Sequence, residues 1–284
     1  MPGDRGDSKI ATQAHDIPGP LLAQAEVLDL ANVGGPNFLL TLGLAAGEAR
    51  LRALGRFARL RAWPAPPLGP GPLLDRPISI HRLPDRGAEF LIRKVGPGTA
   101  LLSSLERGAR VRLIGPLGRG LDDLDPSFSS KSWHLVAGGA GLGPMASFLE
   151  ALPGRARLFY GERSGSLQVD RGFLSRLAPG AVAVTEDGSG YGRRGLVTAP
   201  LEAALGKDPR PILACGPPAM LAALARLAQK CSVPLVACAE ARMGCGLGVC
   251  LSCSLPLLDG SNLRVCQQGP VIDGLAVDWG CPGD

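Results

Sequence analysis

The sequence predicts an α/β plus β chain with an antiparallel β-barrel, then a parallel-sheet α/β domain, then a small cysteine-rich domain. Three observations predict this order. Short apolar stretches between residues 21 and 114 are separated by Gly and Pro clusters, which is typical of a small antiparallel barrel. From Lys131 onward, strand-like and helix-like stretches alternate, as they do in a parallel sheet covered by helices. After about residue 239 the chain is dense in Cys and Gly and shows little periodicity, which indicates an ordered loop folded around a bound group.

Length and composition support a globular chain with two domains and a small appendage. The chain has 284 residues, 45% of them hydrophobic and 19% charged, with a mean hydropathy of +0.16, so it has enough apolar surface for a sizeable core. The 40 Gly and 26 Pro lack a triplet period and indicate tight turns and binding loops. The net charge is +5, but the basic residues are scattered and aromatic residues make up only 4%, so we expect no nucleic-acid partner.

Neither a membrane segment nor a secretory signal is expected. Glycines and a proline break the longest apolar stretch, residues 135–152, which therefore suits a strand–loop–helix passage. Residues 1–19 are polar, lack an apolar core and are predicted to be a disordered tail. We therefore predict a cytoplasmic protein, in which the eight cysteines are free thiols or metal ligands.

The barrel is expected over residues 20–127. Its predicted strands are residues 25–32, 37–44, 89–95 and 109–115, each an apolar stretch of strand length. The Pro-rich segment 63–77 is predicted to be a loop between strands, because Pro cannot donate to a sheet ladder. A helical pattern interrupts the barrel at residues 98–108.

The α/β domain is expected over residues 128–238. Its predicted strands are residues 132–139, 156–162, 181–187 and 211–217, and its predicted helices are residues 144–152 and 218–230. The last of these strands ends in Cys215-Gly216. Ligands bind at the carboxyl edge of such sheets, so Cys215 and Gly216 are candidate nucleotide-site residues.

The third domain, residues 239–284, contains the strongest motif of the chain. Four cysteines have the spacing C-x4-C-x2-C-x12-C, and the first three match the plant-type [2Fe–2S] loop: Cys245, Cys250, Cys253 and Cys266. Gly244, Gly246 and Gly248 let backbone N–H groups turn inward toward anionic sulfur. A structural zinc site is the alternative, although zinc ligands usually come as two C-x2-C pairs. Cys231, Cys238 and Cys281 are interpreted as ordinary thiols.

An iron–sulfur cluster carries one electron at a time, so a flavin is the expected partner cofactor. The stretches RPISI (76–80), LIRKVGPGT (91–99) and GPLGRG (115–120) resemble the flavin-binding barrel of the ferredoxin-NADP reductase superfamily. Arg76 and Arg93 are fork-shaped donors suited to phosphate oxygens. Gly98-Thr99 opens a predicted helix whose free N–H groups can face an anion.

A nucleotide loop is predicted at AGGAGLGP (137–144), which follows a predicted strand and leads into a helix. Its alternating glycines are Gly139, Gly141 and Gly143, and a simple tight turn is the other interpretation. Glu162 and Arg163 are candidates for the adenosine end of a dinucleotide, with a solvated loop as the alternative. Cys215 is a candidate neighbour of the nicotinamide.

From about Leu21 to Trp279 the chain resembles the electron-transfer subunit family of NAD-dependent dihydroorotate dehydrogenase. The most specific pieces are CGPPAML, EARMGCGLGVCLSC and RVCQQGPVIDG. The resemblance implies a [2Fe–2S] cluster on the four motif cysteines and a nicotinamide dinucleotide in the α/β domain. It also implies FAD contacts in the barrel at Arg76, Pro77, Ile78, Ser79, Leu91, Ile92, Arg93, Gly98 and Thr99.

The resemblance further implies a division of work between two proteins in pyrimidine (UMP) biosynthesis. A separate FMN-containing dihydroorotate dehydrogenase catalytic subunit would oxidise dihydroorotate, and electrons would pass through the cluster and FAD to NAD+, in a heterotetramer with two of each chain. Two alternatives stay open. One is a sister flavin/iron–sulfur reductase subunit of a hydrogenase, sulfide-linked or ferredoxin-linked complex. The other is a zinc-stabilised scaffold module that is not an enzyme.

Overall fold

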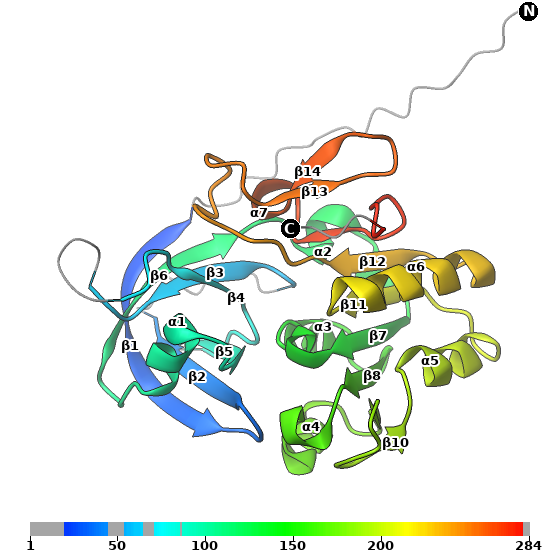
Figure 1. Cartoon of the computed structure of the whole chain (residues 1–284), viewed down its shortest axis with the longest axis horizontal. Helices are drawn as coiled ribbons and strands as arrows, with labels where there is room; N and C mark the ends of the chain where they lie inside the picture. Colours follow the sequence, from blue (N-terminus) through cyan, green and yellow to red (C-terminus); the bar gives the residue numbers. More distant parts are fainter. Residues whose placement is uncertain (1–19, 45–53, 65–70, 86, 281–284) are drawn as a thin grey trace, which may run out of the picture.

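The computed structural model describes residues 20–44, 54–64, 71–85 and 87–280 of the chain, in which two large sheets lie next to each other (Figure 1). The tail predicted for residues 1–19 and the thiol of Cys281 lie outside the described residues. Within the described part, none of the helices combines the length and apolar character that crossing a bilayer demands.

The first sheet is the predicted antiparallel barrel, which is confirmed. Its strands run in the order β4-β3-β6-β1-β2-β5, with β4 and β5 at the two edges. Their bounds are β1 Leu21–Asn32, β2 Asn37–Gly43, β3 Phe57–Arg61, β4 Arg76–Ser79, β5 Gly87–Arg93 and β6 Arg110–Leu117, with helix α1 at Pro97–Ser103. The strand prediction missed β3 and β4. Both are short, and β4 contains Pro77, which an edge strand tolerates.

The second sheet is the predicted parallel sheet, in the order β10-β9-β8-β7-β11-β12-β15. Every neighbouring pair is parallel except β12 with β15. The strands are β7 Trp133–Gly138, β8 Ala156–Glu162, β9 Val182–Thr185, β10 Arg193–Arg194, β11 Ile212–Cys215, β12 Leu235–Cys238 and β15 Val271–Asp273. The α-helices of this region are α2 Leu121–Leu124, α3 Met145–Ala151, α4 Arg171–Leu177, α5 Thr198–Leu205 and α6 Pro218–Cys231, with short 3-10 turns at Phe128–Ser130, Gly139–Leu142 and Gly165–Leu167.

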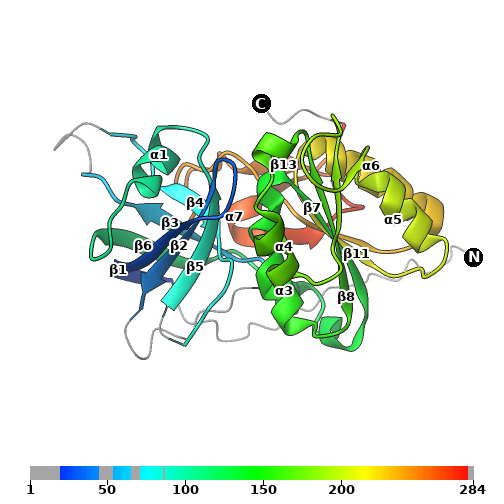
Figure 2. The same ribbon diagram turned by 90° about the horizontal axis from the view of Figure 1, so that it is seen from below.

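Helices cover both faces of this sheet (Figure 2). Along β7, Val136 packs in the cluster that holds residues of α5 and α6, whereas Leu135 and Ala137 pack in the cluster that holds residues of α3 and α4. Successive strand side chains point to opposite faces, so a strand buried on both sides is apolar throughout. That accounts for the continuous apolar run at residues 135–137.

The prediction that the strand ending at Cys215 is the last of the sheet is wrong. Strand β12 follows α6 and pairs in parallel with β11. It escaped prediction because it comprises only four residues, all buried, after Pro234. The cysteine-rich segment also has more regular structure than expected. It contains the hairpin β13 Ser254–Pro256 with β14 Asn262–Arg264, turning at Gly260, then helix α7 Val265–Gln268. Its last strand, β15, completes the α/β sheet.

The two domains meet at His81, which is 1% exposed. Its Nδ1 lies 2.6 Å from the carbonyl oxygen of Gly143, and its ring stacks on Phe173 with centroids 6.2 Å apart. Burial, helped by the charge of Arg82 and opposed by the bond to Gly143, lowers the pKa of His81 to about 4. The junction therefore holds a neutral imidazole that donates from Nδ1.

This histidine makes the stability of the junction sensitive to acid. The folded pKa of about 4 lies below the ordinary 6.5, so the contribution is complete above pH 6.5 and is lost as pH falls toward 4. We expect about 3 kcal/mol of unfolding free energy to be lost over that range through His81. Urea unfolding at several pH values would measure it. His81→Gln should show a shallower pH slope than the wild type, and equal slopes would contradict the assignment.

Candidate functional site

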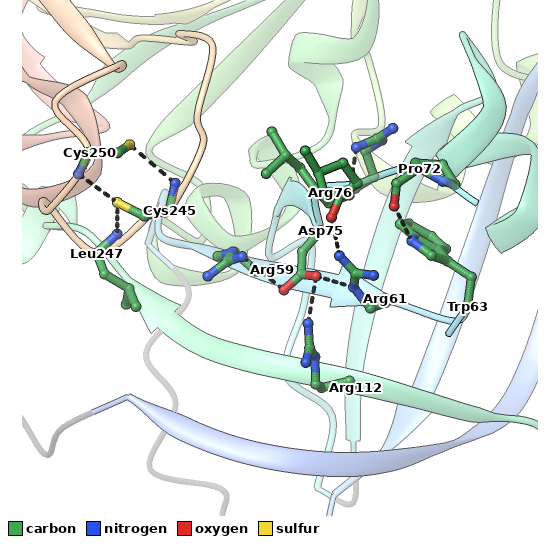
Figure 3. Close-up of polar contacts among 12 residues, drawn as sticks. Arg59, Arg61, Trp63, Pro72, Asp75, Arg76, Arg112, Cys245, Leu247 and Cys250 are labelled. Carbon is green, nitrogen blue, oxygen red and sulfur yellow. Dashed lines mark hydrogen bonds and ion pairs between the residues drawn. The ribbon is translucent and has the colours of Figure 1, made fainter. Parts of the chain in front are cut away.

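The four motif cysteines lie in two pairs around the loop that leads from β12 to α7. In the first pair, the backbone N–H of Cys245 donates to Sγ of Cys250 at 3.3 Å, and that of Cys250 donates to Sγ of Cys245 at 3.4 Å (Figure 3). In the second pair, the N–H of Cys266 donates to Sγ of Cys253 at 3.5 Å. The N–H of Gly248 reaches Sγ of Cys266 at 3.2 Å and so joins the two halves.

Backbone amides converge on these sulfurs because the loop adopts left-handed conformations. Gly246 and Gly248 have φ of +65° and +79°. Between and beside them, the N–H groups of Leu247 and Val249 both donate to Sγ of Cys245 at 3.3 Å. Amides aimed at sulfur stabilise negative charge there. The loop is therefore shaped for anionic ligands, as the glycine pattern predicts.

The thiol of Cys250 is made more acidic by its neighbours. The hydroxyl of Ser252, 3.1 Å from Sγ, together with the backbone amides of Ser252 and Cys245, lowers the pKa of Cys250 to about 6. Burial, with the neighbouring Cys253, raises the pKa of Cys266 to about 11. The thiolate is the form that binds metal.

The pairing bears on the choice between zinc and an iron–sulfur cluster. In the described part of the chain, no group of three or more His, Cys, Asp or Glu side chains converges on a point that a single metal ion would fill. A structural zinc ion needs four ligands at one point. Two ligand pairs joined through a loop of inward amides instead suit two irons with two thiolates each. The donor set fits a [2Fe–2S] cluster better than zinc.

The candidate flavin site is formed by residues of the two edge strands of the barrel and of helix α1. Arg76 to Ser79 form β4, residues 91–93 end β5, and α1 begins at Pro97. Gly98 lies so close to Arg76 that an added Cβ would overlap the guanidinium. The Arg76 guanidinium also lies 5.7 Å from the centroid of the Trp63 ring. A forked donor is thus held beside the start of a helix, an arrangement suited to a pyrophosphate.

Thr99 acts locally. Its hydroxyl accepts hydrogen bonds from the N–H groups of Val95 and Gly96 at 2.9 and 3.1 Å and donates to the Gly96 carbonyl at 3.0 Å. The residue is buried, so its side chain is occupied in shaping the turn before α1. Any ligand contact at Thr99 therefore falls to its backbone.

The candidate nucleotide site is a cavity of about 750 Å³ at the carboxyl edge of the parallel sheet. Its lining includes Gly139 and Gly141 after β7, Glu162 and Arg163 after β8, and Gly216 after β11. The chain runs from β7 outward to β10 and then returns to β11 beside β7, so the cavity lies at the topological switch point. The volume is in the range of sites for cofactors and substrates.

Two of the predicted nucleotide residues do not line this cavity. Gly143 faces the barrel instead, where an added Cβ would lie 3.5 Å from the Leu91 carbonyl oxygen and 3.9 Å from Cβ of Ser79. Cys215 is 1% exposed, and burial raises the pKa of its thiol well above its usual range. The backbone of Cys215 packs against Gly141 and so shapes the cavity wall from behind.

Substituting Gly141 tests the nucleotide cavity. An added Cβ would overlap the carbonyl of Cys215 and lie 2.9 Å from N of Gly216, so the backbone must shift. We expect Gly141→Ala to weaken NADH binding more than about tenfold, or about 1.4 kcal/mol, with flavin content retained. Fluorescence titration of NADH measures this. Gly206→Ala is the matched control, because its Cβ would meet nothing closer than 3.7 Å; equal affinities of the two variants would refute the placement.

Arg93 was predicted to contact the flavin and Glu162 the adenosine end of the dinucleotide, and in the structure the two form one ion pair between the domains. Both terminal nitrogens of Arg93 bond the carboxylate of Glu162, whose side chain is 2% exposed. Nε of Arg93 donates to the Asn37 side chain at 3.0 Å. The hydroxyl of Tyr160 donates to Glu162 at 3.0 Å, and burial together with that carboxylate raises the pKa of Tyr160. The pair therefore fastens the end of β5 to the end of β8.

Sequence reasoning missed two features of the site. The first is Glu240, whose side chain lines the cavity. Desolvation by the protein around it raises the pKa of its carboxyl. It was missed because β12, which ends just before it, was not predicted. The second is Arg59, whose stem lies against Gly246 of the cysteine loop. The alternation of Arg59 and Arg61 in one short strand was the available signal.

Comparisons with known proteins agree with this architecture. Residues 240–278 match the profile of the iron-sulfur cluster binding domain of dihydroorotate dehydrogenase B. A Clostridium acetobutylicum protein named dihydroorotate dehydrogenase B (NAD(+)), electron transfer subunit, is 34% identical over 80% of this chain and 87% of its own length. A Desulforamulus reducens protein of the same name is 33% identical over 81% and 88%.

The structural comparison supports the fold. An NADH-dependent reduced ferredoxin-NADP oxidoreductase superposes with a TM-score of 0.75, covering 91% of each chain at 20% identity. At that identity, the likeness concerns the fold alone. The barrel and the parallel sheet are thus arranged as in this class of reductase.

Proposed function

This chain belongs to the family of electron-transfer subunits of dihydroorotate dehydrogenase B, and on that premise we propose that it passes electrons through a [2Fe–2S] cluster and FAD to NAD+. The electrons would come from an FMN-containing catalytic subunit that oxidises dihydroorotate in pyrimidine biosynthesis. The observation that carries the proposal is the arrangement of the four cysteines as two pairs within one loop of inward amides. Bound there, the cluster supplies one-electron transfer and FAD couples it to a two-electron acceptor.

The residues of this chain divide the work of holding the cofactors. Cys245, Cys250, Cys253 and Cys266 would ligate the irons. Arg76 and the N–H groups at the start of α1 would bind the flavin pyrophosphate, and Ser79 would contact the isoalloxazine. The remaining proposed FAD contacts are Pro77, Ile78, Leu91, Ile92, Arg93, Gly98 and Thr99. The glycines after β7 and Gly216 after β11 would let NAD approach the backbone closely.

Arg93 belongs to both the proposed flavin site and the nucleotide cavity. It lines the nucleotide cavity from the flavin strand while its guanidinium is bound to Glu162. A cation held there keeps the two domains, and so the two cofactors, in one relative orientation. No step of the proposed transfer requires an acid or a base from Arg93.

We propose that the catalytic subunit docks on the cysteine loop and passes its electrons to the cluster there. Three apolar side chains of this loop face solvent: Leu247, Val249 and Leu251 are 42%, 81% and 54% exposed. Contiguous exposed apolar residues mark interaction surfaces. They flank the exposed Cys250 in the sequence, so we propose that a partner docked on them would lie close to the cluster. Two copies of each chain in a heterotetramer is the assembly we propose.

A charge placed on this surface tests the docking proposal. We expect Val249→Asp to weaken binding to the catalytic subunit by at least about tenfold, because the carboxylate must be desolvated in the interface. The cluster should remain, since the Val249 side chain is exposed to solvent and only its backbone N–H group bonds Sγ of Cys245. Analytical ultracentrifugation of the mixed subunits measures the affinity. Leu101→Asp, on α1 of the barrel, is the control; equal loss in both variants would contradict the surface.

The cofactor content tests the proposed function as a whole. Protein purified without air should show flavin absorption and an iron–sulfur shoulder that dithionite bleaches, and it should contain FAD, two irons and acid-labile sulfide per chain. A colourless protein that takes up one zinc ion and no flavin after anaerobic reconstitution would overturn the proposal.

A further inference from the structure

Four charged residues form a network around one buried carboxylate, between the cysteine loop and the flavin strand (Figure 3). Asp75, which is 2% exposed, directly precedes β4. Its Oδ2 lies 3.0 Å from Nη2 of Arg59, and its Oδ1 accepts hydrogen bonds from Nε of Arg61 and from Nη2 of Arg112, the latter at 2.7 Å. We call this set the Asp75 network.

The network carries an excess of positive charge. Arg61 in β3 stands directly opposite Arg112 in β6, a cross-strand pair of like charges that would be destabilising by itself. Asp75 offsets part of that repulsion, and the arginines in turn keep the pKa of Asp75 below its usual range although burial raises it. One carboxylate against three guanidiniums leaves two cationic charges uncompensated within the network.

One member of the network touches the loop that holds the cluster. A Cβ added to Gly246 would lie 2.8 Å from Cδ and 3.7 Å from Nε of Arg59. The loop backbone therefore lies directly on the stem of Arg59, next to Cys245 and Leu247. The Arg59 side chain is 14% exposed, so its charge is poorly screened by water. On its other side, Asp75 fixes the guanidinium.

We propose that Arg59 is a positioning residue that raises the reduction potential of the iron–sulfur cluster. The inference rests on the proposed function. Four thiolates and two sulfides make the cluster anionic, and the added electron makes it more so. A fixed cation nearby stabilises the reduced form more than the oxidised form. Asp75 holds the Arg59 guanidinium in place beside Gly246. Because Asp75 directly precedes Arg76, the same carboxylate also lies at the start of the flavin strand β4.

The test is a redox titration of the cluster in the full-length protein, followed by electron paramagnetic resonance. Arg59→Met keeps the aliphatic stem beside Gly246 and removes the charge. We expect the equilibrium between oxidised and reduced cluster to shift about tenfold toward the oxidised form, which for one electron is about 59 mV to more negative potential. Arg59→Lys keeps the charge and should restore the wild-type potential.

Arg112→Gln is the matched control. It removes a hydrogen bond to the same carboxylate from β6, and Figure 3 shows Arg112 meeting Asp75 from a different side than Arg59, so it should cost stability and leave the potential unchanged. The proposal is overturned if Arg59→Met leaves the potential unchanged, or if Arg112→Gln shifts it equally. If Arg59→Met does not retain iron, Arg59→Lys decides, and a displaced potential in that variant also overturns the proposal. Wild-type protein without iron and sulfide would instead refute the proposed function itself.

Discussion

Replacing Cys250 with Ala is expected to abolish electron transfer from the catalytic subunit, by more than about 100-fold, while the flavin and nucleotide sites remain. Loss of a second-shell group around a metal typically costs 10–100-fold, and loss of a ligand should exceed that. Cys250 is exposed, so truncating it removes little packing. Its Sγ accepts the N–H of Cys245, and the variant therefore also loses the first cysteine pair.

Three measurements define the result for Cys250→Ala. Iron and acid-labile sulfide should fall to background, dihydroorotate-dependent NAD+ reduction should disappear, and oxidation of NADH by an artificial two-electron acceptor should persist. Cys231→Ala is the control, a half-buried thiol in α6 outside the motif. Full iron content in Cys250→Ala, or loss of iron in Cys231→Ala, would contradict the ligand set.

Replacing Arg93 with Met is expected to lower the free energy of unfolding by about 3–5 kcal/mol, the usual cost of leaving a buried charge without its partner. Glu162 would then be a buried carboxylate beside Tyr160 that has lost its Arg93 partner. Urea unfolding of the protein, followed by tryptophan fluorescence, measures the change. The measurement should be made on protein stripped of flavin, because Arg93 is also a proposed flavin contact.

A double-mutant cycle separates the ion pair from other roles of Arg93. Once Glu162 is replaced by Gln, the Arg93→Met substitution should cost about 1–3 kcal/mol less than it does alone, because no buried charge is left unpaired. Additive effects of the two substitutions would show that the pair does not fasten the domains.

The fold was predictable where periodicity and turn signals were long enough to read. The alternation of apolar strand and helix from Trp133 onward predicted the parallel sheet, which the structure contains, and the turn residues Asp259-Gly260 lie between β13 and β14 of the hairpin. Strands β3, β4 and β12 escaped for local reasons: β3 carries two arginines in five residues, β4 contains Pro77, and β12 has only four residues directly after Pro234. The joining of β15 to β12 is a pairing between distant segments, which no local pattern indicates.

The candidate site divides in the same way. The cysteine spacing and its glycines are local features, and the converging amides at Cys245 follow from them. The ion pair of Arg93 with Glu162 and the contact of Arg59 with Gly246 join residues that lie far apart in the sequence. In local sequence terms Arg93 was predicted only as a flavin contact, and Arg59 was not singled out. Only the packing of the barrel against the neighbouring elements gives these arginines their partners.

The most direct test of the central claim is the reduction of this protein by its proposed partner. The purified chain, mixed anaerobically with an FMN-containing dihydroorotate dehydrogenase catalytic subunit and dihydroorotate, should show bleaching of its iron–sulfur absorption, and added NAD+ should then be reduced. Neither change should occur without the catalytic subunit. Bleaching that needs no catalytic subunit, or a cluster that stays oxidised in the assembled complex while NADH reduces it readily, would contradict the account.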